Sequence, residues 1–206
     1  MRLVTVLVQE LAAAQTEHWD ELSYRASVVA DRTQAHVSLV GGWPPGRAQE
    51  PTSPAFQEAL AKLRSATAPA GLGAWFTISL TVRADGEVGV SYDFDTEPWF
   101  LPPPGPEDYA RDFERFPRSV ETQPSWLRER LSWARLTPEQ TVRANRGAYA
   151  LRPYPPAPGG QRHMFTVTVT PEDDVEVYDH ASGGRAFVDR HGAVRLADPD
   201  RPIRPD

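Results

Sequence analysis

The sequence predicts an α+β fold, in which helices pack on one face of an antiparallel β-sheet and a β-rich extension follows at the C-terminal end. The main observation is a hairpin between Trp75 and Trp99, where apolar and polar residues alternate on both sides of Asp85-Gly86. Asp-Gly supplies the positive backbone φ that a tight hairpin turn requires. A second observation is that segments with the apolar period of a helix precede and follow this hairpin.

The first half of the chain is predicted to contain helices and two hairpins. Residues 3–19 have an apolar stripe at helical spacing. Residues 22–30 and 35–40 alternate as strands, with residues 31–34 as the turn between them. A helix is expected over residues 54–66, because Ser53 is a capping residue and Pro54 suits the first helical position. We expect one core face from the apolar positions of the second hairpin, namely Phe76, Ile78, Leu80, Val82, Val88, Val90, Tyr92 and Phe94.

The second half begins with a stiff, proline-rich connection over residues 98–106. Three helices are expected after it, over residues 106–116, residues 125–134, and from a capping box of Thr137 and Gln140 to about Tyr149. A glycine- and proline-rich loop is expected over residues 153–160. Four short strands then follow, over residues 164–170, 175–179, 186–189 and 194–196. We therefore divide the chain into an α+β domain over residues 1–135 and an extension over residues 136–206, which belongs to the same domain or forms its own.

Charge and cysteine content exclude several classes of protein. The 28 acidic residues outnumber the 22 basic ones, and the net charge of -6 argues against nucleic-acid binding as the main task. The acidic excess is concentrated between Asp85 and Glu121. The chain has no cysteine, so it has neither a disulfide scaffold nor a zinc-thiolate site. Neither a signal peptide nor a membrane span is expected, and we predict a cytoplasmic protein without a membrane partner.

An acidic edge follows the second hairpin and has three interpretations. Asp93 and Asp95 share one face of the strand, and Glu97 lies just beyond it. The three carboxylates form a solvated edge that prevents wrong strand pairing, or a Mg²⁺ site of a metal-assisted hydrolase, or a surface that recognises a basic partner. For the third interpretation, the candidate partner-binding residues are Asp93, Asp95, Glu97, Trp99, Phe100, Tyr109 and Asp112. Aromatic anchors beside acidic side chains are typical of such surfaces.

Catalytic and metal-binding patterns are otherwise absent from the sequence. The five histidines lack the spacing of a helical metal pair. Asp179-His180-Ala181-Ser182 contains the residue types of a catalytic triad, but the nucleophile elbow Gly-x-Ser-x-Gly does not occur, and we interpret the segment as a β-turn. Gly71-Leu72-Gly73 precedes a strand and is interpreted as a turn, since phosphate-binding glycine loops follow strands. No cofactor is expected.

Residues 3–100 resemble the YezG-like immunity proteins of bacterial polymorphic toxin systems, in their actinobacterial branch. The resemblance rests on the Trp-led strand Trp75–Thr81 and on the stretch Asp85–Asp95, after a leading helix and a first hairpin. Residues 108–127 look like the continuation found in such proteins, whereas the chain after Arg135 extends beyond them. The resemblance implies an inhibitor without catalysis, whose partner is a toxin domain that acts as a nuclease or degrades NAD(P). The alternative is a protein that binds a small molecule or a metal ion, as in the hydrolase with Asp93, Asp95 and Glu97.

Overall fold

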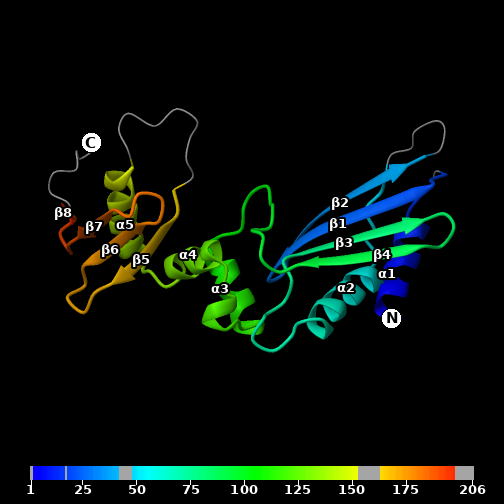
Figure 1. The fold of residues 1–206 in the computed structure, drawn as a ribbon, viewed down its shortest axis with the longest axis horizontal. Coiled ribbons are helices and arrows are strands. Elements are labelled where there is room, and N and C mark those ends of the chain that lie inside the picture. The colour runs from blue at the N-terminus through cyan, green and yellow to red at the C-terminus, as the bar shows by residue number, and fades with distance from the viewer. Residues whose placement is uncertain (1, 17, 42–47, 153–162, 198–206) are drawn as a thin grey trace. The chain divides into compact units, whose positions relative to one another are not determined.

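The computed structural model describes residues 2–16, 18–41, 48–152 and 163–197, and these form two compact units, residues 1–124 and residues 125–206 (Figure 1). Each unit contains a four-stranded antiparallel sheet with helices, which confirms the predicted α+β class and the β-rich C-terminal part. None of the helices among the described residues is long and apolar enough to cross a membrane. The predicted loop over residues 153–160 lies outside the described residues.

The first unit places two hairpins side by side in one sheet. Its strands follow the order β2-β1-β3-β4, and all neighbours are antiparallel. Its elements, in chain order, are α1 (Arg2–Ala13), β1 (Glu21–Val29), β2 (Arg32–Val40), α2 (Pro54–Ala66), β3 (Thr77–Arg83), β4 (Val88–Asp93), α3 (Pro106–Arg115) and the short 3-10 helix η1 (Val120–Thr122). The predicted helix over residues 54–66 is confirmed, and the Ser53 side chain accepts a hydrogen bond from the Phe56 N–H at 3.1 Å.

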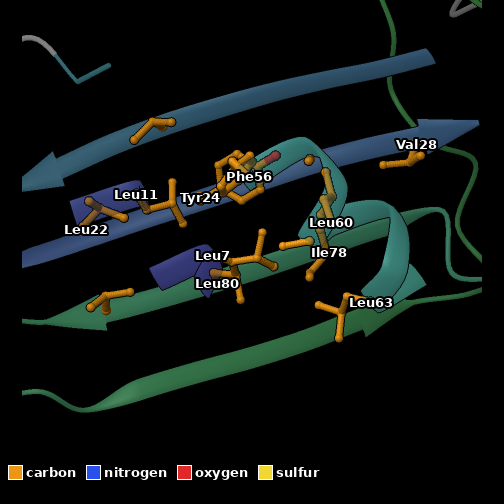
Figure 2. Packing of buried hydrophobic residues seen from close by; sticks show 14 of the residues in the cluster. Leu7, Leu11, Leu22, Tyr24, Val28, Phe56, Leu60, Leu63, Ile78 and Leu80 are labelled. Atoms are coloured by element: carbon orange, nitrogen blue, oxygen red, sulfur yellow. The ribbon is translucent and has the colours of Figure 1, made fainter. Parts of the chain in front are cut away.

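The core of the first unit lies between the sheet and the helices α1 and α2 (Figure 2). Leu7 and Leu11 of α1 are fully buried, and the ring of Phe56 in α2 meets the ring of Tyr24 edge-on at 5.3 Å. Burial raises the pKa of Tyr24, and the nearby Glu50 adds to this shift. The core therefore forms on the sheet face that carries Leu22, Tyr24, Ala26 and Val28 of β1 and Ile78, Leu80 and Val82 of β3.

The opposite face of this sheet is polar because side chains alternate along each strand. We call it the open face, and it consists of Ser23, Arg25 and Ser27 of β1, Gln34, His36 and Ser38 of β2, and Thr77, Ser79 and Thr81 of β3. Arg25 and His36 are exposed. The sheet therefore has one face that contributes to the core and another that carries hydrogen-bonding and basic groups, buried at Ser27 and Thr77 and exposed at Arg25 and His36.

Strand β4 corrects the expectation that both strands of the second hairpin contribute to one core face. Its register with β3 places Val88 and Val90 on the same face as Leu80 and Val82, as predicted. Val88 and Val90 nevertheless remain 41% and 36% exposed. The reason is the sheet order, since β4 is the edge strand and the core residues of α1 and α2 pack over β1 and β3.

The turns of both hairpins differ from the predicted ones. In the second hairpin the Arg83 N–H donates to the Glu87 carbonyl, and the Gly86 N–H to the Arg83 carbonyl, so the turn has three residues, with Gly86 at φ 93°. In the first hairpin β2 already begins at Arg32, and Ala30, at φ 50°, occupies a two-residue turn in place of residues 31–34. Asp112 of α3 accepts a hydrogen bond from the Ala30 N–H at 2.7 Å, a tertiary contact that local sequence patterns do not indicate.

One helix of the predicted set is shorter than expected, and another closely matches its predicted range. Helix α1 ends at Ala13, well before residue 19, and the Gln15 side chain donates to the Leu11 carbonyl at 3.0 Å just beyond its end. Helix α3 ends at Arg115, within one residue of the predicted end. The Gln15 contact satisfies one of the carbonyls that a helix leaves unpaired at its C-terminus.

The second unit packs helices against a β-meander. Its elements are α4 (Ser125–Trp133), α5 (Pro138–Leu151), β5 (Phe165–Val169), β6 (Val175–Asp179), β7 (Arg185–Val188) and β8 (Val194–Leu196), and its sheet follows chain order. The capping box of Thr137 and Gln140 is confirmed. The unit begins at Ser125 and not at residue 136, because α4 joins β5 through Trp133, whose Nε1 donates to the Phe165 carbonyl at 2.8 Å.

Candidate functional site

The candidate site is the connection between β4 and α3, which we call the 93–101 segment. It begins with Asp93, whose Oδ1 accepts hydrogen bonds from the backbone N–H groups of Asp95 at 3.0 Å and Thr96 at 2.9 Å. Burial raises the pKa of Asp93, but these N–H groups, the Thr96 hydroxyl and the nearby charge of Arg25 outweigh it, so the pKa lies below its ordinary value. Asp93 is therefore an ionised turn residue that redirects the chain out of β4.

Strand β2 holds the far end of the segment. The Leu101 N–H donates to Oε1 of Gln34 at 2.7 Å. The guanidinium of Arg32 donates to the Pro102 carbonyl at 3.0 Å and forms an ion pair with Asp108 of α3 at 3.3 Å. These contacts and the prolines that follow fix the backbone of the segment against the sheet.

Two large apolar side chains of the segment face solvent. Trp99 is 70% exposed and Leu101 is 76% exposed, whereas Phe100 between them is buried. The Phe100 ring lies under the guanidinium of Arg32, with 5.8 Å between Cζ and the ring centroid. Phe100 thus points inward, whereas its neighbours Trp99 and Leu101 point outward. The contacts with Gln34 and Arg32 hold this part of the segment in place.

A cavity of about 300 Å³ lies where the segment meets the open face. The cavity is lined by the basic side chains of Arg25 and His36 from the sheet and by the acidic side chain of Glu97 from the segment. The lining residues are Arg25, Ser27, Gln34, Ala35, His36, Thr77, Thr96, Glu97 and Trp99. Sequence reasoning missed Arg25, Gln34 and His36; their alternation with the core residues of β1 and β2 is the signal that assigns them to the open face.

The acids of the predicted set have separate tasks in this structure. Asp95 is exposed, and its negative charge lies near enough to Arg118 to affect its pKa. Burial lowers the pKa of Arg118, and the charge of Asp95 opposes that shift. Glu97 is half-buried and lines the cavity. Among the described residues, no group of three or more His, Asp or Glu side chains is arranged to hold a metal ion. The hydrolase alternative therefore lacks the ligand set that it needs in this part of the chain.

Three other residues of the predicted surface are buried. Phe100, Tyr109 and Asp112 are 7%, 2% and 4% exposed, so their side chains are not available to a partner that approaches this surface. Asp112 instead forms a bidentate ion pair with Arg64 of α2, at 2.7 and 2.9 Å. Helix α3 packs its Tyr109 and Asp112 side toward the sheet and α2, since Asp112 contacts Ala30 in the turn between β1 and β2 and Arg64 of α2.

The second unit contains the residues of the apparent triad, arranged as a hairpin loop. His180, the histidine of the predicted segment, contacts the Thr166 hydroxyl through Nε2 at 2.7 Å. A different histidine, His163, contacts an oxygen of Asp179 through Nδ1 at 2.9 Å, and Oγ of Ser182 donates to the same oxygen at 2.6 Å. A catalytic relay requires the histidine between the serine and the acid, and here the acid lies between them. The Gly183 N–H donates to the Asp179 carbonyl at 2.8 Å and closes the loop between β6 and β7. The turn interpretation is confirmed.

No protein-family model matches the sequence. No curated protein matches it either. The function must therefore be argued from the site itself.

Proposed function

We propose that this chain is a cytoplasmic immunity protein that binds a cognate bacterial toxin domain and occludes its active site or substrate path, without catalysis of its own. The observation that carries the proposal is the exposed pair Trp99 and Leu101 on a segment held in place by Gln34 and Arg32. A tryptophan that is 70% exposed has a large apolar surface with no role in the core.

An exposed tryptophan and leucine on a fixed backbone are suited to binding a protein partner. Tryptophan is enriched among the residues that dominate binding energy at interfaces. A backbone that is already fixed loses little conformational entropy when a partner binds, so more of the contact energy appears as affinity. The Trp99 and Leu101 side chains therefore meet the requirements of interface anchors.

Charge supports a basic partner. Asp93, Asp95 and Glu97 precede the anchors, and the stretch from Asp85 to Glu97 contains no lysine or arginine. Arg25 and Arg118, from other parts of the fold, offset part of the charge of Asp93 and Asp95. Complementary charge at an interface steers association and excludes partners of the wrong sign. A basic toxin domain fits this surface, and the resemblance to YezG-like proteins implies a nuclease or an enzyme that degrades NAD(P).

The test is complex formation with the toxin domain of the large secreted protein encoded beside this chain. The double variant with Trp99→Ala and Asp95→Arg should bind at least about thirtyfold more weakly in titration calorimetry and lose protection of cells, since an interface anchor is worth about 2 kcal/mol or more. Val120→Ala is the matched control, because Val120 is 66% exposed in the same unit but lies outside the segment. The absence of any complex with the parent chain would refute the immunity function.

The cavity of about 300 Å³ favours a second candidate, the binding of a small molecule, since ligand pockets begin near this size. Arg25 and His36 on one side and Glu97 on the other would orient a ligand that carries both charges. Native mass spectrometry of the chain purified from its own host distinguishes the candidates. A bound mass of a few hundred daltons that disappears in an Arg25→Ala variant would support the ligand-binding function.

A further inference from the structure

The free edge of β4 presents backbone groups in a defined pattern. The Arg83 N–H donates to the Glu87 carbonyl, and the Phe76 N–H donates to the Asp93 carbonyl, so the odd-numbered positions of β4 face β3. Antiparallel geometry then directs the N–H and C=O groups of Val88, Val90 and Tyr92 away from β3, toward the edge where the sheet order ends. These three residues form a template for one further strand.

The same residues expose apolar side chains. Val88 and Val90 are 41% and 36% exposed, and Tyr92 is half-buried, with its ring stacked on Trp75 at 5.8 Å. All three lie on the sheet face that carries the core. A strand added at this edge would therefore satisfy backbone groups and bury apolar surface together.

Strand β4 lacks the usual protection of an edge strand. Its sequence from Val88 to Tyr92 contains neither charge nor proline, and its register with β3 runs without a bulge. The other edge strand, β2, carries Arg32 and His36. The contrast between the two edges indicates that β4 is open to pairing.

The charges at the ends of β4 select the partner. Glu87 precedes the strand, and Asp93 ends it. In a symmetric antiparallel pairing of two copies of this chain centred on Val90, Glu87 of each copy lies opposite Asp93 of the other, and like charges at opposed positions destabilise a sheet. Arg83 compensates Glu87 in part, through an ion pair of 3.0 Å, and the nearby charge of Arg25 compensates Asp93 in part, so the repulsion between the two copies is reduced but not removed. The edge therefore fits a strand with basic ends better than a second copy.

We propose that β4 accepts an extended segment of the partner as a fifth strand of the sheet, a segment with apolar side chains at alternate positions and lysine or arginine at its ends. The inference rests on the proposed function, since the segment belongs to the toxin domain. The anchors Trp99 and Leu101 lie near β2, at the other end of the sheet order, so strand addition at β4 is a second contact with the same partner.

Hydrogen exchange of the full chain, free and in complex with the toxin domain of the neighbouring secreted protein, tests the pairing. The amides of Val88, Val90 and Tyr92 should exchange at least about tenfold more slowly in the complex, because pairing with a partner strand removes them from water. A complex that leaves these amides unprotected overturns strand addition and leaves the proposed function in place. The absence of a complex overturns both.

A proline substitution tests the same contact by affinity. Val90→Pro removes the one N–H that faces the free edge at the centre of β4, and an edge strand tolerates proline at such a position. We expect at least a tenfold weaker complex. Val90→Thr, which keeps the N–H group and the branched shape, should bind within about threefold of the parent.

Thermal unfolding of each variant, followed by circular dichroism, shows whether it is folded. Equal affinity of the folded Val90→Pro variant and the parent overturns the proposal. If Val90→Pro does not fold, the exchange experiment on the parent chain decides alone. Analytical ultracentrifugation tests whether the free chain is a dimer. If it is, and if the double variant with Val88→Lys and Val90→Thr is a monomer, the edge pairs with a second copy and the proposal is overturned.

Discussion

Replacement of Asp112 by alanine is expected to lower the free energy of unfolding of the first unit by about 3–5 kcal/mol, the usual cost of removing one partner of a buried ion pair. The side chains of Arg64 and Asp112 are 4% and 6% exposed. Asp112 accepts hydrogen bonds from both terminal nitrogens of Arg64, at 2.7 and 2.9 Å, and from the Ala30 N–H at 2.7 Å. Its loss leaves a buried guanidinium without a counter-charge and a backbone N–H without its acceptor.

The size of this loss in stability follows from the few contacts that Arg64 keeps in the Asp112→Ala variant. Its Nε still donates to the Trp75 carbonyl at 3.0 Å, and its guanidinium lies over the Phe116 ring, with 4.8 Å between Cζ and the centroid. Neither contact neutralises the charge. A hydrogen bond to a charged group contributes about 1.5–3 kcal/mol, so two such bonds account for the estimated range.

Hydrogen exchange at increasing urea concentration is the assay, because it resolves the free energy of unfolding of each unit within the full chain. Glu58→Ala is the matched control, since Glu58 forms an exposed pair with Lys62 on the same helix and its removal should leave stability unchanged within error. The double variant Arg64→Met with Asp112→Leu should recover part of the loss. A loss below about 1 kcal/mol for Asp112→Ala would show that the buried pair does not hold α2 and α3 to the sheet.

Two further perturbations test the second unit and the candidate site. Burial raises the pKa of Asp179, but the hydrogen bonds from Ser182, His163 and the Ala181 N–H outweigh it, so the folded pKa lies below that of the unfolded chain. The carboxylate therefore stabilises the fold above a pH of about 4, and this contribution is lost as the pH falls through the folded pKa. Asp179→Asn should lower the melting temperature at neutral pH and make the melting temperature depend less on pH in the acid range. An acid dependence equal to that of the parent would contradict this link between the pKa and stability. Gln34→Leu removes the acceptor of the Leu101 N–H, and we expect about tenfold weaker toxin binding in calorimetry with stability changed by less than about 1 kcal/mol. Equal affinity would mean that the fixed backbone contributes nothing to recognition.

Local signals in the sequence predicted most of the regular elements. Ser53 with Pro54 and the pair of Thr137 and Gln140 mark helix starts that the structure confirms, because a cap and its acceptor lie within a few residues of one another. The strands over residues 165–196 follow in the same way from alternation and intervening turns. The conflict between triad and turn at Asp179 was also decided by local pattern.

The candidate site was predicted only in part. Trp99 and Asp95 are exposed as expected, and Glu97 lines the cavity. The sequence contained no sign that Asp112 faces inward, since an acid on an amphipathic helix is normally solvated. Its burial is accompanied by the ion pair with Arg64, which lies 48 residues away in the chain.

The sequence by itself determined which segments form helices and strands, which residues share a face, and where the acidic stretch lies. Only the tertiary structure decided which of those faces are covered. Val90 has the same alternation as Leu80, yet Leu80 lies on a central strand beneath the helices and is buried, whereas Val90 lies on the edge and is exposed. The physical reason is that alternation is a property of one strand, but burial depends on the neighbours that the whole chain brings to it.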